Sequence, residues 1–136
     1  MNTKIEVGFN KIGRIQDLAD LARSLFPHNK RHQKVYLAIF IELKYADGQS
    51  LSSLNWIADK YKISRRIFEI VRAKMRRLGI IDHISRFNRN YGYREAWMLS
   101  KRFNKSLIIL GDYFDSFRES QDYKQELKDR DLFKYL

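Results

Sequence analysis

The sequence predicts a mostly helical α+β domain, and two observations carry this prediction. Apolar residues recur at three- and four-residue steps over most of the chain, which is the period of amphipathic helices. Between residues 80 and 99, two β-prone runs flank a polar segment that contains a glycine, which is typical of a hairpin. The length of 136 residues and the 44% apolar content suit a single domain over residues 1–136.

The N-terminal half predicts two helices. Apolar residues at three- and four-residue steps indicate a flanking helix over residues 12–26, which Pro27 would end. Asn29 is expected to cap a second helix, whose apolar stripe includes Ile39 and Leu43. This second helix would open the core of the domain, which we expect over about residues 30–100.

A shorter helix, a tight turn and a longer helix are expected next. Ser52 or Ser53 is placed to cap the shorter helix. Ser64 is placed as the N-cap of a helix from Arg65 to Leu78, and Gly79 stands where a left-handed residue would end that helix. The hairpin over residues 80–99 follows directly.

Helices are also expected over residues 101–136. The first would run to Glu119 and carries Leu107, Leu110, Phe114 and Phe117 on one side. Additional apolar residues widen this surface beyond what one contact face needs. We therefore weigh two interpretations of the four residues, an intramolecular core and the interface of a homodimer.

The positive charge is concentrated in one part of the chain. The formal net charge is +11, and residues 60–94 hold eleven basic but only two acidic residues. A concentrated basic block of this kind is typical of a surface that binds a polyanion.

The pattern over residues 51–99 resembles the winged helix-turn-helix DNA-binding superfamily. The resemblance rests on Leu54, Ile57 and Ala58 of the shorter helix, on the Ile63-Ser64 turn, and on the run from Met75 to Ile81. In that superfamily such a run closes the recognition helix and opens the wing. The turn departs from the common pattern because it lacks a glycine or other small residue. The flanking helices are also similar in arrangement to those through which MarR-like regulators dimerise.

A set of polar and basic residues would then meet duplex DNA. The residues on the recognition helix share one face by their spacing. The guanidinium groups of arginines on that face would donate hydrogen bonds to guanine in a major groove. Basic residues in the hairpin would contact phosphates or enter the minor groove. Glu69 would accept from cytosine or pair with a neighbouring arginine. The expected DNA-binding residues are Ser53, Lys62, Ser64, Arg65, Arg66, Glu69, Arg72, Ala73, Arg76, Arg86, Asn88, Arg89, Asn90, Tyr91 and Arg94.

Other functional classes find little support in the sequence. There is no cysteine, no glycine-rich phosphate loop and no paired catalytic constellation, so we predict neither an enzyme nor a cofactor. No metal-binding motif contains any of the three histidines, His28, His32 and His83. We interpret them as surface or helix-terminal residues. No segment predicts a membrane span or a signal peptide, and we expect a cytoplasmic, nucleoid-associated protein.

The sequence therefore predicts sequence-specific binding of double-stranded DNA by a homodimer, as a regulator of transcription. Two alternatives stay open. One is a replication initiator or chromatin-like protein that binds DNA with low specificity. The other is a winged helix that mediates protein interactions in a replication or transcription assembly.

Overall fold

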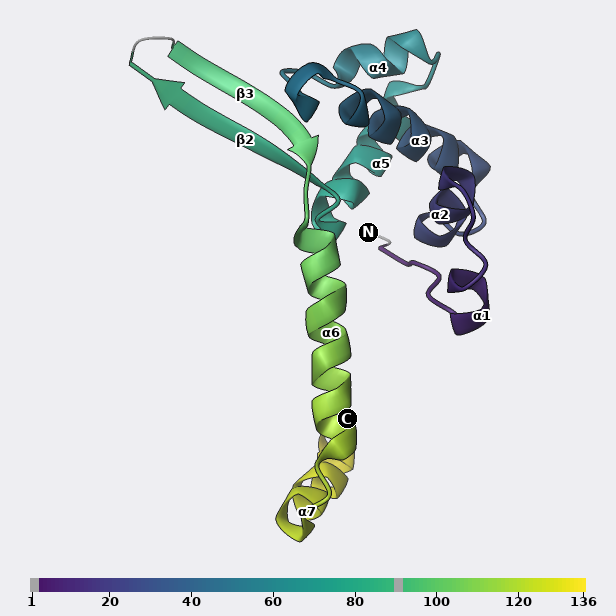
Figure 1. The fold of residues 1–136 in the computed structure, drawn as a ribbon, viewed down its shortest axis with the longest axis vertical. Coiled ribbons are helices and arrows are strands. Elements are labelled where there is room, and N and C mark those ends of the chain that lie inside the picture. Colours follow the sequence, from purple (N-terminus) through teal and green to yellow (C-terminus); the bar gives the residue numbers. More distant parts are fainter. Residues whose placement is uncertain (1–2, 90–91) are drawn as a thin grey trace. The chain divides into compact units, whose positions relative to one another are not determined.

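The computed structural model describes residues 3–89 and 92–136, and of residues 86–88, 92 and 93 it describes the backbone alone. The chain folds into two compact units, Met1–Arg102 and Phe103–Leu136. The secondary structure is mostly helical with one three-stranded antiparallel sheet, which confirms the predicted α+β class (Figure 1).

The sequence predicted one helix over residues 12–26, whereas the structure has one short helix that ends at residue 12 and a second one within that range. These are α1 (Phe9–Ile12) and α2 (Leu18–Leu25). Gly13 follows the end of α1, and the carboxylate of Asp17 accepts a hydrogen bond of 2.8 Å from a backbone N–H in the first turn of α2. The prediction of one continuous helix was wrong because this cap starts a new helix within the run of apolar spacing.

Helix α3 (Lys30–Lys44) is the centre of the first unit. The Asn29 side chain accepts a hydrogen bond of 3.1 Å from the backbone N–H of His32, which confirms the predicted cap. Ile39 and Leu43 have no exposed surface. Helix α3 packs against α2, α4, α5 and the sheet, and Figure 1 shows α2, α4 and α5 beside it.

Helix α4 (Asn55–Lys60) does not begin at the predicted serine cap. The N-cap position is Leu54, and the Ser53 hydroxyl accepts instead from the backbone N–H of Asn55, at 3.3 Å. The prediction was wrong because the chain turns at Ser53 before it enters the helix. The four residues after α4 form a tight turn, in which Lys62 takes a left-handed φ of 55°. The turn of winged helix-turn-helix proteins, which this segment resembles, commonly has a small residue.

Helix α5 (Arg65–Leu78) has the predicted bounds and both predicted ends. The Ser64 hydroxyl accepts a hydrogen bond of 3.2 Å from the backbone N–H of Ile67. Gly79 ends the helix at a φ of 83°, in the left-handed conformation. Such a terminus directs the chain straight into the following strand.

The sheet joins a short strand to the hairpin. A 3-10 turn, η1 (Asp47–Gln49), leads into β1 (Ser50–Leu51), and β2 (Ile81–Asn88) and β3 (Gly92–Leu99) form the predicted hairpin. The strand order is β1-β3-β2. The register pairs Ile81 with Leu99 and His83 with Trp97, which sets these two aromatic rings beside α5.

The second unit contains the remaining predicted helices. It comprises α6 (Arg102–Glu119), which starts at the last residue of the first unit, α7 (Tyr123–Leu132) and the 3-10 turn η2 (Phe133–Tyr135). The Asp122 carboxylate caps α7 by accepting a hydrogen bond of 3.1 Å from the backbone N–H of Gln125.

Two glycines predict opposite responses to the same substitution. Gly79→Ala forces a Cβ into the left-handed conformation and should lower the free energy of unfolding by about 1 kcal/mol. Gly111→Ala, in the exposed interior of α6 with no atom within 4 Å of the added Cβ, should stabilise that helix by up to about 1 kcal/mol. Urea titrations followed by circular dichroism measure both changes. A Gly79→Ala variant that is as stable as the wild type would contradict this account of Gly79.

Candidate nucleic-acid interface

Helix α5 presents one apolar face to the core. Phe68, Val71 and Met75 are each at most 1% exposed. Their burial against α3 fixes the rotation of α5 about its axis, so residues three and four apart on the other sides of the helix share defined surfaces.

The surface of α5 beside the hairpin is strongly basic. A hollow of about 650 Å³ lies between this face of the helix, the hairpin and Arg102, the first residue of α6. Its lining comprises Glu69, Arg72, Ala73, Arg76, Arg77, His83, Trp97 and Arg102. Four of the predicted site residues, Glu69, Arg72, Ala73 and Arg76, therefore lie together.

Arg72 is held in place by other side chains of the protein. Its guanidinium donates to Asn55 Oδ1 at 3.1 Å and to Glu69 Oε2 at 2.5 Å. Its Cζ lies 5.1 Å from the centre of the Trp97 ring and 5.4 Å from that of Phe68. The side chain is only 19% exposed. Glu69 thus pairs with Arg72, one of the two roles expected for it.

Arginines at the two ends of α5 are more exposed than Arg72. Arg65 lies 3.8 Å from the carboxylate of Asp59, and both side chains are well exposed. Within the described part of the chain, the guanidinium groups of Arg66 and Arg76 have neither a hydrogen-bond nor an ion-pair partner. These two groups are available to a ligand without the loss of an internal contact.

His83 and Trp97 form the hairpin side of the hollow. Their rings stack with centroids 4.1 Å apart and planes 12° apart. His83 Nε2 is buried and accepts or donates no hydrogen bond among the described residues, although Glu95 Oε2 lies 3.7 Å away. Arg102 closes this side through an ion pair with Asp82 and a hydrogen bond of 3.2 Å to the carbonyl of Ile81.

Helix α4 is tied to α3 by one carboxylate. Glu42 Oε1 accepts from Lys60 Nζ at 2.6 Å and from the Tyr61 hydroxyl at 2.8 Å. The hydrogen bond from Lys60, followed by that from Tyr61, lowers the pKa of Glu42 below its usual value. One cation of the basic block therefore serves to position α4.

The structure describes the side chains of some of the predicted DNA-binding residues outside α5 but not of others. Ser53, Lys62 and Ser64 lie around the turn between α4 and α5, and Arg89 and Arg94 are exposed on the hairpin. Asn90 and Tyr91 lie outside the described residues, as do the side chains of Arg86 and Asn88.

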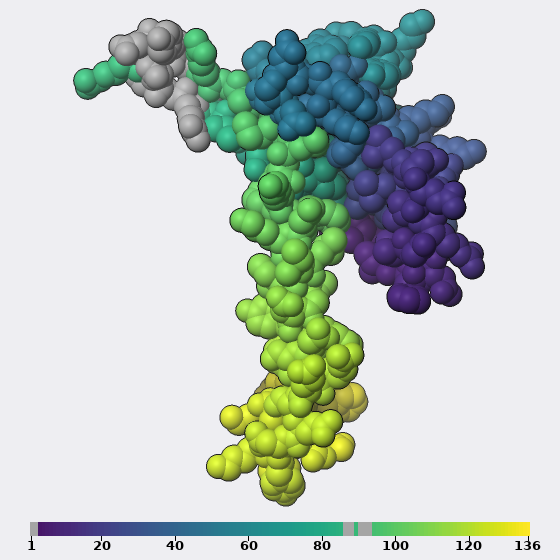
Figure 2. Space-filling view, in the orientation of Figure 1, coloured from purple at the N-terminus to yellow at the C-terminus, as the bar shows by residue number. Residues whose placement is uncertain are grey.

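The four residues considered for a dimer interface are all exposed on α6. Their exposed fractions are 41% for Leu107, 66% for Leu110, 64% for Phe114 and 69% for Phe117. Figure 2 shows side chains of α6 at the surface. The rest of their own unit, Phe103–Leu136, leaves these side chains uncovered, and the homodimer interface stays a prediction.

Sequence reasoning missed the residues that complete the hollow, namely His83, Trp97, Arg77 and Arg102. The alternation along the two strands places His83 and Trp97 on one side of the sheet, which is a signal that could have found them. The histidines do not gather, since His28 and His32 line another hollow. Among the described residues, no group of three or more metal-ligating side chains converges.

Comparisons with models of protein families, with curated proteins and with solved structures found no match to this chain. No helix in the described part of the chain combines the length and apolar character that a membrane crossing needs.

The contacts of Arg72 predict different stabilities for two arginine variants on one face of α5. Arg72→Ala removes two hydrogen bonds and two ring contacts and should lower the free energy of unfolding by about 1–2 kcal/mol. Arg76→Ala removes no contact within the described residues and should change it by less than about 0.5 kcal/mol. Chemical denaturation measures both, and equal losses would show that Arg72 is not held as the structure places it.

Proposed function

We propose that this chain binds double-stranded DNA as a winged helix-turn-helix protein. The observation that carries the proposal is the basic face of α5 beside the hairpin, which includes Arg76. The guanidinium groups of Arg76 and of the exposed Arg66, near the start of α5, have no hydrogen-bond or ion-pair partner among the described residues. An α-helix fits the major groove, and arginine is the residue that most often reads guanine there. The hairpin would then lie along the DNA backbone as the wing.

The order of elements supports this proposal. Helix α4, a four-residue turn and α5 have the lengths of a helix-turn-helix, and a two-stranded hairpin follows α5 directly. Arg89 and Arg94 bring positive charge to the hairpin, where phosphate contacts would fix the position of the protein on the duplex.

We further propose that the binding is sequence-specific and serves to regulate transcription. Arg66 and Arg76 are the groups best placed to read bases. The pairing of Glu69 with Arg72 favours the alternative of a low-specificity binder, because it occupies two of the side chains that would discriminate bases. Selection of bound sites from a random DNA pool at a stated salt concentration distinguishes the two: an enriched site supports a specific regulator, and no enrichment supports the alternative.

Charge removal on α5 should weaken DNA binding more than charge removal elsewhere. Arg66→Gln should cost about 1–3 kcal/mol on a selected site and relax one base position. Arg23→Gln is the control, because it removes one arginine charge from α2, where Arg23 pairs with Asp20 and does not line the hollow beside the hairpin. Fluorescence anisotropy with a labelled duplex measures both affinities.

The same assay over a range of salt concentrations tests the contribution of phosphates. Four to eight neutralised phosphates would give a log–log slope of roughly −4 to −7. A flat salt response, or an equal loss in Arg23→Gln and Arg66→Gln, would refute DNA binding through α5 and leave the protein-interaction alternative.

We also propose that two chains associate through the exposed apolar face of α6. Leu107, Leu110, Phe114 and Phe117 follow steps of three, four and three residues, the spacing by which helices pair along a seam. A two-fold dimer would place two recognition helices on half-sites one helical turn, about 34 Å, apart or a multiple of it.

Leu110→Glu should give folded monomers, because Leu110 is exposed and its replacement disturbs no internal packing. Ser116→Glu introduces the same charge on the opposite side of α6 and should leave the dimer intact. Light scattering with circular dichroism measures both. A wild-type monomer at tens of micromolar protein would contradict the dimer.

A further inference from the structure

A second, smaller hollow lies on another side of α5. Its volume is about 280 Å³, and it is enclosed by the N-terminal arm, the connection from α2 to α3 and one side of α5. The titratable groups that line it are all basic, namely Lys4, His28, His32, Lys74 and Arg77. No carboxylate is among the described residues that form the lining.

Lys74 places a buried charge in this hollow. The residue is 7% exposed, and its ammonium donates to the carbonyls of Leu25 at 2.6 Å and Lys4 at 2.7 Å. The ammonium also lies 4.3 Å from the centre of the Phe26 ring. These neighbours offer partial negative charge only, whereas buried charges in proteins are commonly paired.

The surroundings of Lys74 disfavour its positive charge. Burial, and in second place the nearby charge of Arg77, lower the pKa of Lys74 below its usual value. Burial and the charge of Lys74 likewise lower the pKa of His32. Each of these groups would gain from a negative charge in the hollow.

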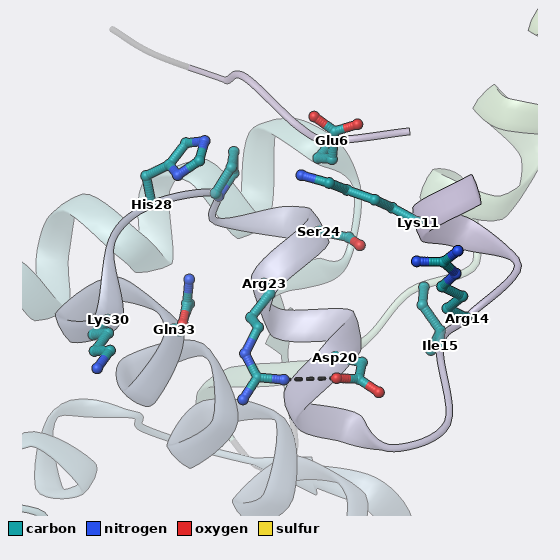
Figure 3. Close-up of a pocket in the computed structure, with 11 residues that line it drawn as sticks. Glu6, Lys11, Arg14, Ile15, Asp20, Arg23, Ser24, His28, Lys30 and Gln33 are labelled. Atoms are coloured by element: carbon teal, nitrogen blue, oxygen red, sulfur yellow. Dashed lines mark hydrogen bonds and ion pairs between the residues drawn. The ribbon is translucent and has the colours of Figure 1, made fainter. Parts of the chain in front are cut away.

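A third hollow in the first unit is lined by carboxylates as well as by basic groups. Figure 3 shows its lining, in which Glu6 and Asp20 accompany the basic residues. Asp20 forms an ion pair of 2.6 Å with Arg23, and Glu6 accepts from a backbone N–H at 2.9 Å. Carboxylates already supply negative charge there, so the hollow around Lys74 is the better place for an anion.

We propose that the hollow around Lys74 binds a phosphate group. An ammonium has three protons, and two of those on Lys74 are used within the protein, which leaves one for a ligand. Arg77 adds a positive charge to the lining, and the imidazoles of His28 and His32 offer further donors. The small volume suits one phosphate or a pyrophosphate rather than a larger ligand.

The position of Arg77 links this hollow to the one beside the hairpin, since Arg77 lines both. A guanidinium drawn toward a phosphate in the smaller hollow is withdrawn from the larger one. Occupancy by a free phosphate compound should therefore weaken DNA binding, a consequence that rests on the proposed function. Binding of the phosphate itself does not rest on it.

The histidines allow the two hollows beside α5 to be observed separately. His32 lies in the smaller hollow and His83 in the larger one. His28 lines both the smaller hollow and the third one, so His32 is the specific reporter of the smaller hollow. Histidine ring resonances, assigned by single substitutions, are followed by NMR during a titration with pyrophosphate at constant ionic strength. We expect the signals of His28 and His32 to shift together along one saturating curve.

Variants of the lining test the proposal. Lys74→Met fills the buried position without charge and should weaken the response of His28 and His32 about 10-fold or more. Arg77→Gln, at an exposed position, provides a second test if the first variant does not fold. Arg76→Gln is the matched control, because it removes the neighbouring charge from the other hollow alone. A linear, non-saturating response, or an unchanged curve in Lys74→Met and Arg77→Gln, would overturn the proposal.

A duplex oligonucleotide distinguishes the two sources of a phosphate. If DNA alone saturates the signals of His28 and His32 and displaces pyrophosphate, the hollow takes a phosphate of the DNA backbone. If these signals still respond to pyrophosphate on the DNA complex, the ligand is a free phosphate compound. Failure of the chain to bind DNA would remove only the DNA arm, because the pyrophosphate titration stands without it.

Discussion

The burial of Phe68, Val71 and Met75 is the constraint on which the other surfaces of the first unit depend. An α-helix turns about 100° per residue, so fixing these three side chains in the core fixes every other direction around α5. Glu69, Ala73 and Arg76 are thereby turned toward the hairpin, and Ile70 and Lys74 toward the N-terminal arm. One packing interaction thus sets the position of two basic surfaces with different surroundings.

Local signals in the sequence predicted the elements well. Asn29, Ser64 and Gly79 act within one turn of a helix, so neighbouring residues are enough to recognise their roles. The error over residues 12–26 has the same origin, because the cap at Asp17 outweighs a continuous apolar period. The hairpin register, and with it the stacking of His83 on Trp97, follows from pairing between strands and was not read from either strand alone.

The charges of the basic block were harder to predict, because a sequence counts all cations alike. Lys60 is committed to Glu42, Arg72 to Glu69 and Asn55, and Lys74 to two backbone carbonyls. Glu69 is three residues from Arg72, so local spacing allowed that pair to be expected. The other partners come from distant segments, beyond the reach of local pattern. Fewer cations are therefore free for a polyanion than the net charge indicates, which favours the smaller of the expected numbers of phosphate contacts.

Lys74 shows how a charge can serve stability and ligand binding at one position. Its ammonium meets the carbonyl of Leu25 at the C-terminal end of α2, where backbone acceptors lack helical partners and the helix dipole favours a cation. The same ammonium holds the arm at Lys4. Because both acceptors are neutral, the segments are joined while the net positive charge persists in the hollow. A carboxylate in their place would join the segments equally well but would cancel the attraction for an anion. The choice of neutral partners is what makes this structural lysine a potential ligand-binding group.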